Sequence, residues 1–291
     1  VIEITNFSIS KVITPEQIPT VAMPFPVSSI IPPVYRYEKY MDIMGDQGSA
    51  VYGDFFFQGM NFNASTMTTY LKIYNLVSKA FIQNVTLYGI TNPLTHSNTL
   101  SFSGNKYDEQ DPFPLLYISS GYRAPGTTTS HVYVYRILEN DGIYSATLIQ
   151  TIFLEDDFLP WSEAMCDPDH NRIWIKTHYT RFRCYQIPDI SSGDVIFTKN
   201  TPTIDDFTIP DQTFGLGVTK SSNQGHLYYK GKIWCSSGIG GPPEGLEAGC
   251  IIVINVRNHC RESVIFLDDI GLTRNNQYND TEPEGIFIWN E

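Results

Sequence analysis

Polar and aromatic residues recur at matching positions of a repeated sequence pattern. Their side chains offer carboxylates, imidazoles, amides and one indole, the groups that orient a ligand in a binding pocket. We therefore predict that eight of them form one ligand-binding funnel: Gln47, His96, Asn98, Trp161, Glu163, Gln224, His226 and Glu284.

The same residues also allow catalysis or metal binding. A glycan hydrolase or lyase would use carboxylates, and glycoside hydrolysis needs two of them about 5–10 Å apart. The catalytic residues of such an enzyme would be Glu163, Glu284, Glu282 and His96. Histidine and glutamate side chains could alternatively hold a divalent cation such as calcium. No G-x-S-x-G, P-loop, G-x-G-x-x-G or H-E-x-x-H motif is present, so we assign no catalytic residue and expect no organic cofactor.

The repeat that carries these residues predicts strands. The segments QGSAVYGDFFFQG from Gln47 and QGHLYYKGKIWCS from Gln224 align without a gap. Related segments begin at Ser97, Glu163 and Glu284, with a longer turn (DPDHN) or an insertion (GNKYDEQDPF) in two of them. The first four units are followed by a second hairpin with alternating apolar residues. Two hairpins in roughly 60 residues are typical of a β-propeller blade.

The two ends of the chain complement each other. The last unit has only its innermost strand, IFIWNE, and IEITNFSISKVI near the N-terminus resembles the outer hairpin of the first full unit. We therefore predict an all-β fold, a single β-propeller domain over residues 1–291 with about five four-stranded blades. Strands from both termini would share one blade and close the ring, which hides sheet edges. Residues 13–40 are Pro-rich and are predicted to form a connecting strap.

Other recurring residues have structural interpretations. Paired aspartates occur in EDDF (155–158), IDDF (204–207) and LDDI (267–270). They are predicted to form the turns that connect one blade to the next, by hydrogen bonds to nearby backbone N–H groups. Five cysteines show no zinc-ligand spacing, so buried thiols are expected. A disulfide between Cys235 and Cys250 is the alternative.

Composition excludes several classes of protein. The 291 residues include 31 acidic and 19 basic side chains, a net charge of −12. Such a chain lacks the cationic surface needed to bind nucleic acid or an anionic membrane. No apolar run reaches the roughly 20 residues of a membrane span, and the first ten residues do not resemble a signal peptide. The abundance of tyrosine, phenylalanine, glycine and proline favours strands and tight turns.

Two segments carry a resemblance to known proteins. The closing strand TEPEGIFIW and the unit HSNTLSF…FPLLYIS…VYRI…LIQTI resemble β-propeller proteins of gut Bacteroidetes and their phages. More distantly, they resemble phage tail receptor-binding propellers and the quinoprotein amine dehydrogenase-like superfamily. The likeness covers residues from about 40 to 291 and implies the propeller fold, but not the superfamily's quinone cofactor.

These observations favour a non-catalytic recognition module, extracellular, at a cell surface or on a virion. It would bind a glycan or a surface protein through its loop-rich face, where the long loops 121–131 and 236–249 are expected. The alternatives are the glycan-active enzyme and a structural virion or cell-surface component. The oligomeric state is not predicted.

Overall fold

The computed structural model is a β-propeller, and it describes most of the strands that the repeat predicts. The described residues are 2–5, 35–36, 46–60, 69–91, 97, 99–122, 129–155, 158, 161–177, 180–209, 223–237, 250–266 and 285–289. In this part of the chain, no helix is long and apolar enough to span a membrane.

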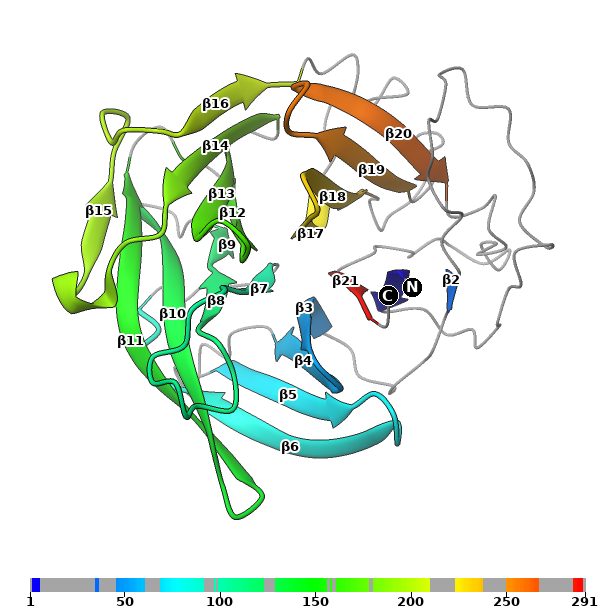
Figure 1. Cartoon of the computed structure of the whole chain (residues 1–291), viewed down its shortest axis with the longest axis vertical. Coiled ribbons are helices and arrows are strands. Elements are labelled where there is room, and N and C mark those ends of the chain that lie inside the picture. Colours follow the sequence, from blue (N-terminus) through cyan, green and yellow to red (C-terminus); the bar gives the residue numbers. More distant parts are fainter. Residues whose placement is uncertain are drawn as a thin grey trace.

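Four blades surround a common centre (Figure 1). Blade I contains β3 (Asp46–Tyr52), β4 (Phe55–Met60), β5 (Thr69–Asn75) and β6 (Ala80–Leu87). Blade II contains β7 (Leu100–Phe102), β8 (Leu116–Ser119), β10 (Thr129–Asn140), β11 (Ile143–Glu155) and β15 (Val195–Phe197). Blade III contains β9 (Gly121–Tyr122), β12 (Trp161–Asp167), β13 (Arg172–Thr177), β14 (Arg181–Gln186) and β16 (Asp205–Thr208). Blade IV contains β17 (Asn223–Tyr229), β18 (Lys232–Ser237), β19 (Cys250–Asn255) and β20 (Cys260–Phe266).

The expectation of about five four-stranded blades is therefore wrong in detail. The fifth sheet has three short strands, β2 (Tyr35–Arg36), β1 (Ile2–Thr5) and β21 (Gly285–Ile288). Blades II and III each gain a fifth strand because segments of the chain cross between them. β15 follows β14 of blade III yet pairs in parallel with β11 of blade II. A repeat count cannot reveal such an exchange.

Tight turns join the strands of hairpins in blades II and IV because their residues accept a positive φ. Lys230 and Gly231 between β17 and β18 have φ values of 44° and 74°. Asp141 and Gly142 between β10 and β11 have 52° and 79°. Positive φ at both central residues defines the turn that suits the twist of a two-residue β-hairpin, and glycine adopts it without steric cost.

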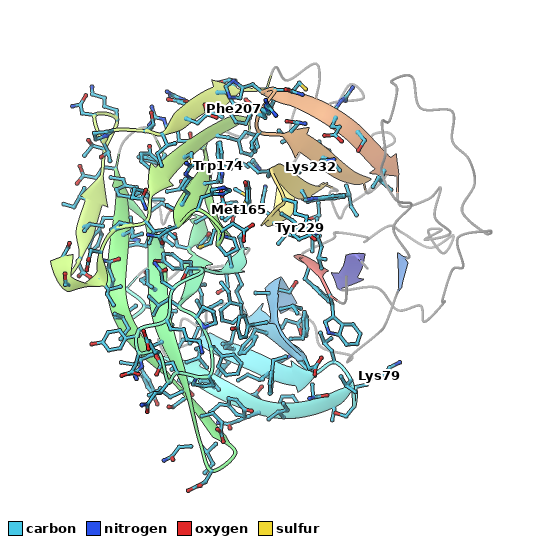
Figure 2. The ribbon with its side chains drawn as sticks, viewed as in Figure 1. Lys79, Met165, Trp174, Phe207, Tyr229 and Lys232 are labelled. Atoms are coloured by element: carbon cyan, nitrogen blue, oxygen red, sulfur yellow. The ribbon has the colours of Figure 1, made fainter. Side chains whose placement is uncertain are left out.

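Along a strand, successive residues pack against different neighbouring blades. In β8, Leu116 and Ile118 belong to the core between blades I and II, whereas Tyr117 between them faces blade III. In β13, Ile173 and Ile175 face blade II. Met165, Trp174 and Phe207 of blade III face blade IV (Figure 2). This two-residue alternation, with both faces buried, accounts for the aromatic and β-branched content of the strands.

The terminal strands pair with each other. β1 runs antiparallel to β21, with Ile2 opposite Ile288 and Thr5 opposite Gly285. β21 contacts β3 and β17, and Phe287 packs on Phe56 with ring centroids 4.9 Å apart. Closure of the ring by these strands stays a prediction. The predicted strap lies outside the described residues except for β2.

The alternative of a disulfide between Cys235 and Cys250 is wrong. Cys166, Cys184 and Cys235 are buried free thiols, and Cys260 is an exposed one. In the register of β18 and β19, Cys235 lies opposite Ile252, and Cys250 lies opposite Ser237. The two cysteines are therefore not cross-strand partners.

Ring closure predicts that the last strand is an integral part of the fold. Phe287 is 1% exposed, so Phe287→Ala should lower the free energy of unfolding by about 3–5 kcal/mol, measured by denaturant titration. Tyr88→Ala, at a ring that is 68% exposed, is the matched control and should change it by about 0.5 kcal/mol or less. If Phe287→Ala proves as mild as the control, the closing role of β21 is refuted.

Candidate functional site

Only part of the predicted funnel falls within the described side chains. Glu163 on β12 and His226 on β17 are described, and both are buried. The others lie outside the described side chains: Gln47, His96, Asn98, Trp161, Gln224, Glu282 and Glu284. The predicted loop segments 123–128 and 238–249 also lie outside, so the funnel as a whole stays a prediction.

Glu163 and His226 belong to one buried polar cluster near the propeller axis. The Nζ atom of Lys176 on β13 lies 3.1 Å from Nε2 of His226, and Thr99 Oγ1 lies 3.4 Å from Nδ1 of the same ring. The tautomer of the imidazole sets which group donates in each of these two contacts. This chain of contacts joins blades II, III and IV.

Glu163 and Lys176 can carry opposite charges within this buried cluster. Glu163 and Lys176 are opposite residues of β12 and β13, which places their Cβ atoms about 5 Å apart. Burial lowers the pKa of Lys176, whereas its neighbours Cys235 and Glu163 act in the opposite direction. A buried ammonium needs a nearby anion, and Glu163 supplies it. We call this cluster the axial tie: the Glu163–Lys176 charge pair lies within blade III, and the contacts of His226 with Lys176 and Thr99 connect it to blades IV and II.

The axial tie predicts strong coupling between Glu163 and Lys176. Glu163→Gln and Lys176→Met should each lower the free energy of unfolding by about 3–5 kcal/mol, because each leaves a buried charge without its counterpart. The double variant should lose about 1–3 kcal/mol less than the sum of the two. Denaturant titrations of the four proteins measure this difference. Strict additivity would rule out the axial tie.

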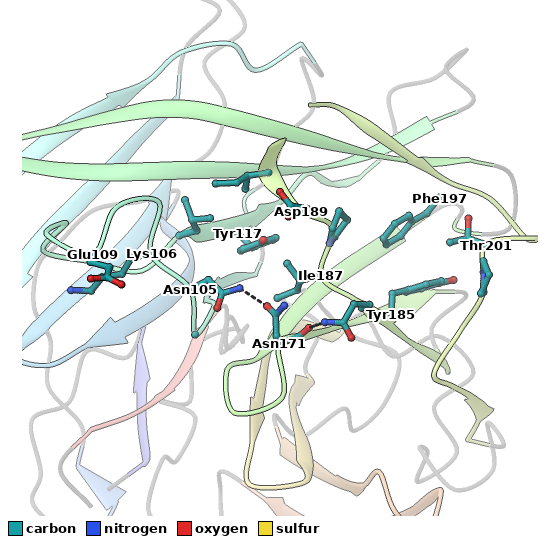
Figure 3. Close-up of a pocket in the computed structure, with 16 residues that line it drawn as sticks. Asn105, Lys106, Glu109, Tyr117, Asn171, Tyr185, Ile187, Asp189, Phe197 and Thr201 are labelled. Atoms are coloured by element: carbon teal, nitrogen blue, oxygen red, sulfur yellow. Dashed lines mark hydrogen bonds between the residues drawn. The ribbon is translucent and has the colours of Figure 1, made fainter. Parts of the chain in front are cut away.

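An open cleft lies between blades II and III, at the opposite end of β12 from Glu163 (Figure 3). Its volume is about 1010 Å³. Strands β8, β14 and β15, the β7–β8 connection, the β12–β13 turn and the segments after β14 and β15 line it. The lining residues are Gly104, Asn105, Lys106, Glu109, Leu115, Tyr117, Asn171, Tyr185, Gln186, Ile187, Pro188, Asp189, Ile190, Phe197, Thr201 and Pro202. The floor is the apolar core between the two blades, which includes Leu115, Ile187 and Phe197.

Amide side chains form part of the rim. Asn105 Nδ2 donates to Asn171 Oδ1 at 2.6 Å, and Gln186 Nε2 donates to the Asn171 carbonyl at 2.8 Å. Glycine at 104 permits this arrangement, because a Cβ there would collide with the carbonyl of Pro168. The two turns can therefore approach closely enough for their amides to meet.

Asp111 anchors one wall of the cleft. Its carboxylate accepts two hydrogen bonds from Arg136 on β10, at 2.6 and 2.8 Å. Its carbonyl accepts from Lys106 Nζ at 2.7 Å, and the Arg136 guanidinium lies over the Tyr107 ring. The hydrogen bonds from Arg136 hold the pKa of Asp111 below its ordinary value. The loop that carries Asn105 is thus fixed to the sheet.

The Asp111 anchor predicts a loss of stability in acid. An ionised Asp111 stabilises the folded chain above the ordinary aspartate pKa of about 3.9. This contribution disappears as the pH falls through the lowered pKa. Asp111→Asn should therefore lower the free energy of unfolding by about 1.5–3 kcal/mol at pH 7 and by progressively less from about pH 4 downward. Denaturant titrations at a series of pH values measure this difference. Asp108→Asn, in the same loop, is the control. A cost that is unchanged by acid would contradict this role.

Of the three predicted aspartate pairs, the structure fully describes Asp205 and Asp206, and both carboxylates already contact basic side chains. Asp206 accepts from Arg181 at 2.7 and 2.8 Å and from Arg183 at 3.2 Å. Asp205 Oδ2 lies 2.9 Å from His259 Nε2, and the His259 ring stacks on Phe207. The two contacts of His259 join blade IV to blade III, whereas those of Asp206 lie within blade III. Within the described residues, no group of three or more His, Cys, Asp or Glu side chains could hold a metal ion.

Comparison with known proteins adds little beyond these observations. No protein-family model matches the chain, and no curated protein matches it. Three similar solved structures are the tail fibre of Staphylococcus aureus phage P68 (TM-score 0.43, 8% identity), a quinoprotein alcohol dehydrogenase-like protein of Bacteroides thetaiotaomicron (0.34, 11%) and hydrazine synthase of Kuenenia stuttgartiensis (0.32, 13%). The matched regions cover 76%, 76% and 72% of this chain, in the same order. They cover only 39%, 45% and 51% of the chains in the three solved structures. Similarities this weak do not bear on function.

Proposed function

We propose that this propeller is a non-catalytic recognition module and that it binds a glycan in the cleft between blades II and III. The observation that carries the proposal is the cleft itself, open to solvent and with a volume of about 1010 Å³. Ligand pockets of about 300–1,000 Å³ are common, with apolar walls and a few polar groups that fix orientation. The apolar floor and the amide rim have this composition.

The cleft carries one basic and two acidic side chains, Lys106, Glu109 and Asp189, so it offers no cationic surface to an anionic ligand and favours a neutral one. Lys106 is held by the Asp111 carbonyl. Asp189 accepts from the backbone N–H of Ser191 at 2.8 Å, at the start of a single 3-10 turn, Ile190–Ser192. The amides of Asn105, Asn171 and Gln186 combine donors with acceptors, which matches the hydroxyl groups of a sugar. This is the chemistry of a neutral oligosaccharide, not of a nucleic acid.

The one described carboxylate of the enzyme alternative is poorly placed to act on a sugar. This residue, Glu163, is 2% exposed and lies beside Lys176. Glycoside hydrolysis needs a carboxylate that reaches the sugar or an activated water. Recognition of a glycan by this chain fits an extracellular, cell-surface or virion location, and we include that location in the proposal.

Blocking the cleft tests the proposed function. Gln186→Trp places a large side chain at the exposed rim, so binding to glycans on an array should fall at least tenfold. Asn258→Trp puts the same side chain in the exposed β19–β20 turn of blade IV and should bind like the parent. An array without hits for the parent, or equal binding by both variants, would refute the proposal.

A further inference from the structure

Tyr117 has a buried hydroxyl at the cleft with no hydrogen-bond partner among the described residues. The side chain is 0% exposed, and Figure 3 shows its hydroxyl directed toward the centre of the cleft. Two tyrosines of the same blade are buried as deeply but are paired. The Tyr133 hydroxyl accepts from the Thr91 N–H at 3.3 Å, and the Tyr135 hydroxyl donates to the Tyr88 carbonyl at 2.7 Å.

An unpaired buried hydroxyl destabilises the folded chain. Phenylalanine would fill nearly the same space without that cost, so packing alone does not explain tyrosine at position 117. Burial also raises the pKa of Tyr117, which keeps the hydroxyl protonated and able to donate. The missing partner is therefore an acceptor that the described part of the chain does not provide.

The surroundings of this hydroxyl restrict what the acceptor can be. Leu115, Ile187 and Phe197 line the same cleft and belong to the same apolar core as Tyr117. A sugar hydroxyl would place a second polar group against these side chains. An acetamido group instead presents a carbonyl oxygen beside a methyl group, so the carbonyl pairs with the tyrosine and the methyl replaces water at the apolar floor.

We propose that the cleft selects N-acetylated sugars and that the bound sugar displaces the side chains that cover Tyr117, so that its hydroxyl donates to the acetamido carbonyl. This inference rests on the proposed function and narrows it to one class of glycan. The rim amides of Asn105, Asn171 and Gln186 would then contact the ring hydroxyls. Tyr117 determines specificity, whereas the rim residues bind any sugar of suitable size.

The test uses two trisaccharides with the same linkage. Chitotriose in its N,N′,N″-triacetylated form carries an acetamido group on each ring, and cellotriose carries a hydroxyl in its place. By isothermal titration calorimetry the parent chain should bind chitotriose about tenfold more tightly, the factor expected for one buried hydrogen bond. Tyr117→Phe should remove this preference and, because the unpaired hydroxyl is gone, raise the midpoint of thermal unfolding.

Tyr133→Phe is the matched control, since it removes a buried hydroxyl that is paired. It should keep the preference for chitotriose and lower the unfolding midpoint. Equal affinity of the parent for both sugars, or a preference that survives Tyr117→Phe, overturns the inference. If Gln186→Trp still abolishes binding to array glycans in that case, the proposed function stands. If no glycan binds the parent, both fall.

Discussion

Each blade is a small sheet with two apolar faces, and neither face can be buried within the blade. Leu116 and Tyr117 are adjacent in β8 yet belong to the cores on opposite sides of blade II. Ile173 and Trp174 divide between two cores in the same way in blade III. A blade is therefore stable only between neighbours, and burial of apolar surface at these interfaces is the main force that assembles the propeller.

The buried polar cluster near the axis and the cleft between blades II and III both follow from this packing. Near the axis the inner strands converge, and the residues that meet there must satisfy one another, as Thr99, His226, Lys176 and Glu163 do across three blades. At the turn end of blades II and III, longer connections separate the blades and leave a cleft above the apolar core. The first feature holds blades together, and the second gives the chain a surface on which a ligand can be recognised.

The sequence predicted the propeller and the buried thiols but miscounted the strands of the sheets. Hairpin turns and alternation are local signals, so they can be recognised in the sequence, whereas the parallel pairing of β15 with β11 is not local. Thr99 and Lys176 do not stand at the repeat positions that predicted the funnel: Thr99 follows Asn98, and Lys176 lies on the second strand of its hairpin, opposite Glu163. The cleft had a signal in the DPDHN turn and the GNKYDEQDPF insertion. Their contact depends on tertiary packing at Gly104.

The central claim is that the cleft between blades II and III is the recognition site. A crystal structure of the chain with a bound oligosaccharide tests it most directly. The account predicts sugar density between the Asn105–Asn171 pair and the segment from Gln186 to Ile190, with an acetamido group directed at Tyr117. Sugar density at the axial mouth beside Glu163, with the cleft empty, would contradict it.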